Sequence, residues 1–329
     1  MEIPSPKIYL APFQGITGAT FRTIYTNHFG GVDKLFTPFF TSIQHDNKLT
    51  PRRLAELGPP QVNSIQVVPQ ILSKDADEII RFSNFCKTLG FSEINWNLGC
   101  PYPQVANKKR GSGMLPYPEM VKSILSEVIC KTEIDFSIKC RLGYFSNQEI
   151  TELIPVFNAF NISELIIHAR IGRQLYSGEP DQSFFGQIAG SFSMPVVYNG
   201  DIFTPEDQKI AQTKFSSINT LMIGRGLLYD PFLPSDIKRF PLSDNRKTLI
   251  NRFINDLYFA YRKQMKDNLS VLSVLKEYWS YLSHSFNEPH KVFKKLKKVQ
   301  SFDEYEEAVL FIFNEYDWAG SGNIVAKPY

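Results

Sequence analysis

The sequence lacks the features that mark secreted, metal-binding or membrane proteins. Its four cysteines, at positions 86, 100, 130 and 140, include no Cys-x-x-Cys pair, which argues against a disulfide scaffold or a zinc site. No uninterrupted apolar run approaches the roughly 20 residues of a membrane span, and residues 1–7 contain no apolar signal core. We therefore expect a reduced, cytoplasmic protein without a bound metal or a membrane partner.

The chain also lacks a strong net charge, at +3 over 329 residues. That balance excludes a polycation but permits a local basic face. Hydrophobic residues make up 43% of the chain, which is enough to bury a core. A (β/α)8 barrel takes about 250 residues, so the length leaves room for a smaller C-terminal unit.

Short apolar runs recur along the first two thirds of the chain, separated by helical stretches. This alternation is typical of βα units around a parallel sheet. Eight runs predict a (β/α)8 TIM barrel, although an open α/β sheet competes if one strand is miscounted. The expected strands are 7–11, 34–39, 64–70, 93–98, 136–141, 164–168, 195–199 and 219–224.

Helix signals lie between these runs. Ser73 and Gly90 bracket a helix over 73–89, another is expected over 117–131, and Thr204 is the expected N-cap of a third. Strand signals stop near Pro241. Helices are then expected over 244–265, 269–285 and 302–313. We predict an α/β fold with two domains, a barrel over 1–240 and a small all-helical domain over 241–329.

Five of the expected strands end in polar groups, where buried strands are normally apolar. These groups are Gln70, Asn97, Lys139 with Arg141, His168 with Arg170, and Asn199. Strand alternation places Lys139 toward the barrel axis and Cys140 toward the helices, and it separates Asn95 and Asn97 from Trp96 and Leu98 in the same way. A barrel binds its ligand where the strands end, so these side chains predict a site there.

The last two strands are followed by a candidate phosphate site. Gly224-Arg225-Gly226 follows the eighth strand, and Asn199-Gly200-Asp201 closes the seventh. Glycines let backbone N–H groups approach a phosphate, and an arginine can bind it with two hydrogen bonds. Because barrels often bind phosphate after strands 7 and 8, the pair predicts a phosphorylated cofactor.

These motifs resemble those of the tRNA-dihydrouridine synthases. Residues 97–101 read Asn-Leu-Gly-Cys-Pro, similar to the family's Asn-x-Gly-Cys-Pro signature, and residues 11–17 resemble its N-terminal segment. The lysine-bearing strand at 137–143 and the His-x-Arg at 168–170 match in the same order, as do residues 199–202 and 222–226. The sequence departs from the family's usual Met at Phe13, Asp at Gly18 and Thr at Ile171.

The resemblance implies a specific chemistry. FMN, reduced by NADPH, delivers hydride to C6 of a uridine in tRNA, and Cys100 gives a proton to C5. A thiol with a pKa of about 8.5 is mostly protonated at neutral pH, so it suits this role without an activating base. The residues that the resemblance assigns to the cofactor are Ala11, Pro12, Phe13, Gln70, Lys139, His168, Asn199, Gly200, Asp201, Gly224 and Arg225.

Binding of a tRNA substrate requires basic groups on the protein. A uridine in folded tRNA has to be flipped out to reach a flavin, and phosphate contacts by Lys and Arg supply most of the affinity. The segment 275–282 resembles the bacterial C-type branch, which modifies position 16 of the D-loop. We expect a monomer that binds tRNA but not DNA. The predicted substrate contacts are Asn97, Lys108, Lys109, Arg110, Arg141, Arg170, Lys294, Lys295 and Lys298.

Two other functions stay open at this point. A flavin barrel oxidoreductase for a free pyrimidine, similar to the dihydroorotate dehydrogenases, explains Lys139 and the phosphate site but not the basic helical region. A non-catalytic tRNA-binding protein that kept the scaffold would bind tRNA without turnover.

Overall fold

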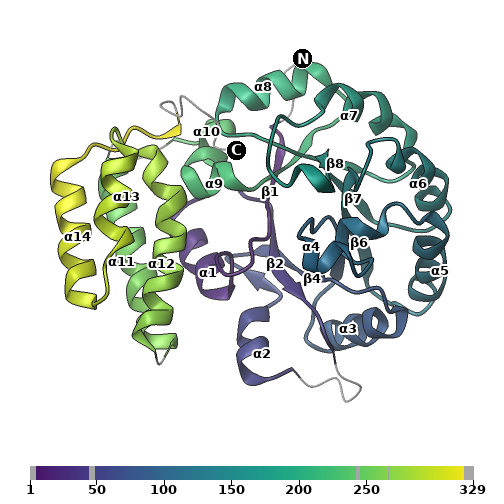
Figure 1. Cartoon of the computed structure of the whole chain (residues 1–329), viewed down its shortest axis with the longest axis horizontal. Helices are drawn as coiled ribbons and strands as arrows, with labels where there is room; N and C mark the ends of the chain where they lie inside the picture. Colours follow the sequence, from purple (N-terminus) through teal and green to yellow (C-terminus); the bar gives the residue numbers. More distant parts are fainter. Residues whose placement is uncertain (1–4, 44–48, 242–244, 266, 322–329) are drawn as a thin grey trace.

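The computed structural model describes residues 5–43, 49–241, 245–265 and 267–321. Eight parallel strands form a closed barrel in the order β2-β1-β9-β8-β7-β6-β5-β4, and β2 pairs with β4 to close it (Figure 1). The predicted TIM barrel is therefore confirmed, and the open sheet is excluded. The strands are β1 Lys7–Leu10, β2 Lys34–Phe40, β4 Ile65–Ile71, β5 Glu93–Leu98, β6 Asp135–Gly143, β7 Glu164–Ile171, β8 Val196–Asn199 and β9 Thr220–Ile223.

One short strand was not expected from the sequence. β3, Gln61–Val62, pairs antiparallel with β4 outside the barrel. The turn between them places Asn63 and Ser64 at φ of 50° and 65°, the left-handed region that a tight hairpin turn requires. A serine carries little signal for that conformation, and so the hairpin was missed.

Helices alternate with the strands and cover the outside of the barrel. The helix expected over 73–89 begins later, because Asp75 is its N-cap and accepts from the Glu78 N–H, while the Ser73 hydroxyl donates to the Glu78 carboxylate. Thr204 caps its helix as predicted, in a reciprocal pair with Asp207. The helices are α1 Ala19–His28, α2 Pro51–Leu57, α3 Ala76–Thr88, α4 Pro103–Ala106, α5 Pro118–Ile129, α6 Glu149–Asn158, α7 Gln182–Ile188, α8 Pro205–Lys214, α9 Arg225–Tyr229 and α10 Leu233–Ile237.

Strand alternation divides the core into two parts. Trp96, Leu98 and Cys140 belong to the large apolar layer between the strands and the helices. Tyr9, Phe36 and Met222 are among the residues of a separate small cluster inside the barrel. The predicted outward direction of Cys140 is thus confirmed, and the inward positions near the ends of β5 to β8 are left to polar side chains.

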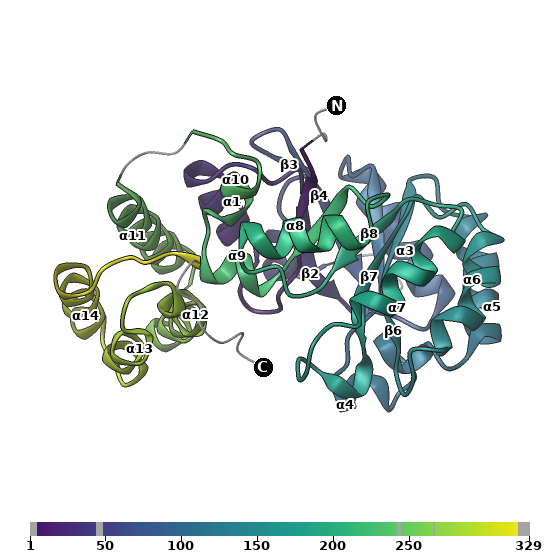
Figure 2. The ribbon, with the colours of Figure 1, turned by 90° about the horizontal axis from the view of Figure 1, so that it is seen from above.

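Four helices follow the barrel; the first two pack against α1, and the last two lie farther out (Figures 1 and 2). The three expected helices are present. The expected start of the first, Asp244, lies outside the described residues. Residues 1–4, part of the N-terminal segment in which no signal sequence was expected, also lie outside them. Among the described residues, no helix is both long and apolar enough to cross a bilayer. The division into domains at residue 240 stays a prediction. The helices are α11 Arg246–Gln264, α12 Asn268–Leu282, α13 Pro289–Lys297 and α14 Phe302–Glu315.

Phe253 of α11 is the centre of the contact between the barrel and the C-terminal helices. Its ring centroid lies 4.9 Å from that of Phe29 and 6.1 Å from that of Phe21, both from the first helical unit of the barrel. The Tyr278 ring of α12 contacts both helices, with its centroid 5.9 Å from that of Phe253 and 5.4 Å from that of Phe21. Such aromatic pairs add to the free energy that burial alone provides.

We therefore expect Phe253→Ala to lower the free energy of unfolding by about 3–5 kcal/mol, the usual cost of truncating a buried phenylalanine. Phe259→Ala is the matched control, because the same residue type on the same helix is 58% exposed. It should change stability by less than about 0.5 kcal/mol. Urea denaturation followed by circular dichroism measures both, and equal effects would contradict the assignment.

Candidate active site

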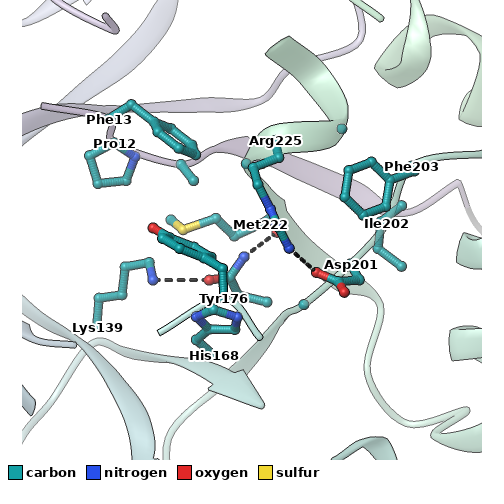
Figure 3. Close-up of a pocket in the computed structure, with 15 residues that line it drawn as sticks. Pro12, Phe13, Lys139, His168, Tyr176, Asp201, Ile202, Phe203, Met222 and Arg225 are labelled. Carbon is teal, nitrogen blue, oxygen red and sulfur yellow. Dashed lines mark hydrogen bonds and ion pairs between the residues drawn. The ribbon is translucent and has the colours of Figure 1, made fainter. Parts of the chain in front are cut away.

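A cavity lies at the end of the barrel where the strands finish (Figure 3). Its lining also includes residues that sequence reasoning missed, among them Tyr176, Phe203 and Met222. The barrel therefore brings together ten of the eleven positions predicted to hold the cofactor, and only Gln70 is elsewhere. The ten are Ala11, Pro12, Phe13, Lys139, His168, Asn199, Gly200, Asp201, Gly224 and Arg225.

Asp201 joins two arginines at one side of this cavity. Arg170 donates to both of its carboxylate oxygens, at 2.9 and 2.6 Å, and Arg225 donates to one of them at 2.7 Å. Burial alone would raise the pKa of Asp201, but the hydrogen bonds and positive charges of the two arginines outweigh it and hold the pKa below its usual value. Asp201 is thus a permanently charged bridge between β7 and α9.

Positive charge exceeds negative charge around the cavity. Asp201 is the one carboxylate among the described lining residues, whereas Lys139 and Arg225 also line it. Lys139 Nζ donates to Asn199 Oδ1 at 2.9 Å, and burial together with the nearby Arg141 lowers its pKa to about 8. Burial first, and then these cations, also hold the pKa of His168 well below its usual value. The arrangement suits an anionic ligand.

Cys100 is held on a tightly fixed loop after β5. Asn97 Oδ1 accepts from the backbone N–H groups of Gly99 and Cys100, at 3.0 and 2.9 Å. Ser112 donates its hydroxyl to the Cys100 carbonyl from the other side, at 3.0 Å. Gly111 has a φ of +55°, and a Cβ there would lie 2.6 Å from the same carbonyl oxygen, so no other residue fits without a shift.

The thiol of Cys100 is nearly buried and is not among the residues that line the cavity. Burial raises its pKa, and the Tyr102 N–H, Arg141 and Lys139 offset this only in part. These charge interactions place the thiol beside the cationic side chains of β6. Asn97 is also the register partner of Lys139, so the loop begins directly next to the cavity. A protonated thiol is therefore available at the barrel mouth.

Gln70 and Asn97 lie in a buried hydrogen-bond chain rather than in the cavity. Asn97 Nδ2 donates to Gln70 Oε1 at 2.6 Å, and Gln70 Nε2 donates to Asn95 Oδ1 at 2.8 Å. Because Asn97 also holds the Cys100 loop, this geometry favours a positioning role for both side chains. Their predicted contacts with the flavin and the base stay predictions.

Two predicted substrate arginines are already engaged in the structure. The side chain of Arg170 has no exposed surface, and it donates to the Gly178 carbonyl in addition to Asp201. Arg141 donates to the carbonyls of Gly99 and Ile171, at 3.1 and 2.9 Å, and so ties the Cys100 loop to β7. For these two arginines the geometry favours roles within the protein.

The remaining predicted substrate residues lie on two separate exposed segments. Lys108, Lys109 and Arg110 follow α4, whereas Lys294, Lys295 and Lys298 lie on or directly after α13. In Figure 2 both α4 and α13 lie toward the lower side of the molecule. Since α4 follows the end of β5, this is the side on which the barrel strands finish. The two segments therefore lie toward the same side of the molecule.

A model of the family described as dihydrouridine synthase (Dus) matches residues 9–315. The tRNA-dihydrouridine synthase B of Pasteurella multocida is 30% identical over 231 residues, which cover 69% of this chain and 67% of that protein. The tRNA-dihydrouridine(16) synthase of Neisseria meningitidis serogroup B is 26% identical over 308 residues, which cover 91% of this chain and 92% of that protein.

Solved structures show the same barrel at low sequence identity. Histamine dehydrogenase from Rhizobium sp. 4-9 has a TM-score of 0.55 at 15% identity, covering 78% of this chain and 50% of that longer one. A variant of NCR from Zymomonas mobilis has a TM-score of 0.50 at 14% identity, covering 74% of this chain and 90% of that one. At these identities the likeness shows the fold alone. The family model, which spans most of the chain, goes further: the chain belongs to the dihydrouridine synthase family.

Proposed function

We propose that this protein reduces uridine to dihydrouridine in tRNA, with FMN as its flavin and NADPH as the reductant. The observation that carries the proposal is a protonated thiol fixed beside a cationic cavity at the mouth of a barrel. Its family and its tRNA-dihydrouridine synthase relatives support the same reaction. A monomeric state, a cytoplasmic location and the absence of DNA binding stay predictions.

The residues that line the cavity fit FMN. The excess of positive charge suits a phosphate, and Arg225 and the backbone around Gly200 and Gly224 are placed to receive it. A Cβ at Gly224 would lie 3.1 Å from the Phe13 ring, so a larger residue would narrow the cavity. Lys139, which also lines the cavity, would supply an ammonium group to a bound flavin.

The proton transfer belongs to Cys100. When bound, FMN reduced by NADPH supplies the hydride that adds to C6 of the uracil ring. Electron density then builds on C5 and on the C4 oxygen, and Cys100 gives its proton to C5. The resulting thiolate takes a proton from solvent, which restores the starting state. The Asn97 and Gly111 contacts keep the thiol in place through the cycle.

Arg170 fixes the form in which His168 meets the ligand. Arg170 Nη1 lies 3.2 Å from His168 Nε2, and a guanidinium can only donate. Nε2 therefore accepts, and Nδ1 carries the hydrogen. Burial and the nearby cations lower the pKa of His168 well below its usual value, which favours the neutral ring, and we infer that His168 offers its Nδ1–H group to the cofactor.

We propose position 16 of tRNA as the target. The match to the Neisseria tRNA-dihydrouridine(16) synthase covers 91% of this chain, so it includes most of the helices after residue 240. The match to the Pasteurella synthase B covers a smaller share of this chain, 69%. The C-terminal helices are the part of the chain most able to set how tRNA docks, and their likeness supports the position.

Cys100→Ala should lower the rate of tRNA reduction by about a hundredfold or more, the usual contribution of a positioned acid. Reduction of bound flavin by NADPH should not change, because Cys100 does not line the cavity. Mass spectrometry of an unmodified tRNA transcript after reaction measures the product, and mapping at single-nucleotide resolution locates it. Wild-type turnover by the variant would exclude Cys100 as the acid, whereas a wild-type protein that reduces no tRNA would overturn the proposed function.

The affinity for FMN should depend on pH through Lys139. An anionic ligand favours the charged ammonium group, so binding takes up a proton once the pH exceeds about 8. The Kd of the apoprotein should be constant just below about pH 8 and rise above it, by up to about tenfold per pH unit. Lys139→Arg keeps its charge and should remove this rise. Quenching of flavin fluorescence measures both proteins, and the same rise in both would point to another group.

The hydrogen on His168 can be observed directly by NMR of protein labelled with 15N-histidine. Two-bond couplings should show the Nδ1–H form without titration between about pH 6 and pH 9. Arg170→Met removes the donor and should shift His168 toward the Nε2–H form, while Arg170→Lys should largely restore the wild-type pattern. Loss of one signal in His168→Gln provides the assignment. An Nε2–H form in the wild-type protein would refute the role given to Arg170.

A further inference from the structure

The loops that follow β5 and β6 carry exposed aromatic rings. Tyr102 is 52% exposed, Phe145 is 50% exposed and Tyr117 is 39% exposed. Two of these rings have a cation beside them. Lys109 Nζ lies 4.0 Å from the centroid of the Tyr117 ring, and Arg173 Cζ lies 4.6 Å from that of Phe145. We call these five residues, Tyr102, Lys109, Tyr117, Phe145 and Arg173, the aromatic rim.

The Phe145 part of the rim is held rigidly. The Glu149 carboxylate accepts from the backbone N–H groups of Tyr144, Phe145 and Ser146, at 2.7, 3.0 and 3.1 Å. The backbone N–H of Arg173 donates to the Tyr144 carbonyl at 3.1 Å, and this bond connects the loop after β7 to the loop after β6. The exposed ring and its cation therefore belong to a built surface rather than to a loose loop.

The rim adjoins the loop of the proposed proton donor. A Cβ at Gly172 would lie 2.2 Å from the Tyr144 ring and 2.7 Å from Ser112 Oγ, so the three loops are packed against one another. Ser112 in turn donates to the Cys100 carbonyl. The rim therefore lies on loops packed against the loop that carries Cys100.

The cations of the rim have no acidic partner in the described part of the chain. No ion pair involves Lys109 or Arg173 there, and the nearby Glu149 is occupied by backbone N–H groups. Exposed aromatic rings next to cations without an acidic partner are typical of surfaces that bind single-stranded nucleotides. The bases stack on the rings, and the phosphates contact the cations.

We propose that the aromatic rim binds the unpaired nucleotides that flank the target uridine. A flipped uridine pulls its neighbours out of their stack, and those bases need new surfaces. Phe145 with Arg173 provides one such surface, and Tyr117 with Lys109 provides another. The inference rests on the proposed function, because it names the part of the tRNA that meets this side of the site.

The test measures the Kd of a fluorescently labelled, unmodified tRNA transcript for the flavoprotein by anisotropy. Phe145→Leu and Arg173→Gln should each raise the Kd by about fivefold or more, since stacking on an aromatic ring contributes about that much per base. Arg173→Gln should also lower the slope of log Kd against log salt by about one. Phe240→Leu is the matched control. Its ring is 47% exposed and also lies beside a lysine, Lys238, and it should bind tRNA as the wild type does.

A second arm places the change on the RNA. Replacing the bases next to the target uridine by abasic linkers should weaken wild-type binding by about the same factor as Phe145→Leu. The two changes together should add little, because both remove one contact. Fully additive losses, or variants that bind like the control, would overturn the rim assignment. Both results leave the proposed function standing, since it depends on whether the wild-type protein forms dihydrouridine.

Discussion

The carboxylate of Asp201 receives hydrogen bonds from Arg170 of β7 and Arg225 of α9, and the rest of the cavity is arranged around that pair of contacts. Removing one partner of a buried ion pair costs about 3–5 kcal/mol, so all three groups depend on one another. Arg170 then reaches His168 and determines which of its nitrogens carries the hydrogen. Asp201 neutralises only part of the local charge. The surplus from Lys139 and the arginines is what a phosphorylated cofactor can use.

The thiol depends on a separate set of contacts. Cys100 is fixed by Asn97, Gly111 and Ser112, and the carbonyl of Gly99 beside it is held by Arg141. None of these described groups binds Asp201, so the cavity and the proposed proton donor are positioned independently. They meet because β5 and β6 are neighbours in the barrel, which sets Asn97 directly opposite Lys139. The pairing of β5 with β6 is therefore what brings the loop of Cys100 next to the cavity.

The sequence predicted the features that depend on backbone periodicity alone. Alternation along β6 was sufficient to place Lys139 inward and Cys140 outward, and the spacing of apolar runs was sufficient to predict the barrel. Features that depend on distances between strands were not accessible. Gln70 ends its strand with the expected polar side chain, yet its partners on β5 decide that it supports Asn97 instead of lining the cavity. Tyr176 lies in a loop, beyond a Leu175 at φ 51°, where no periodicity applies.

The C-terminal helices are more than an attachment to the barrel, because one of them supports a residue that lines the cavity. Tyr281 of α12 packs edge-on against Phe13, at 6.0 Å between ring centroids, and Phe13 lines the cavity next to Gly224. The family usually has a flexible methionine where this chain has the rigid ring of Phe13. A rigid contact at that point joins α12 firmly to the cavity wall. If tRNA docks on these helices as proposed, this contact gives the docked RNA a fixed relation to the cavity.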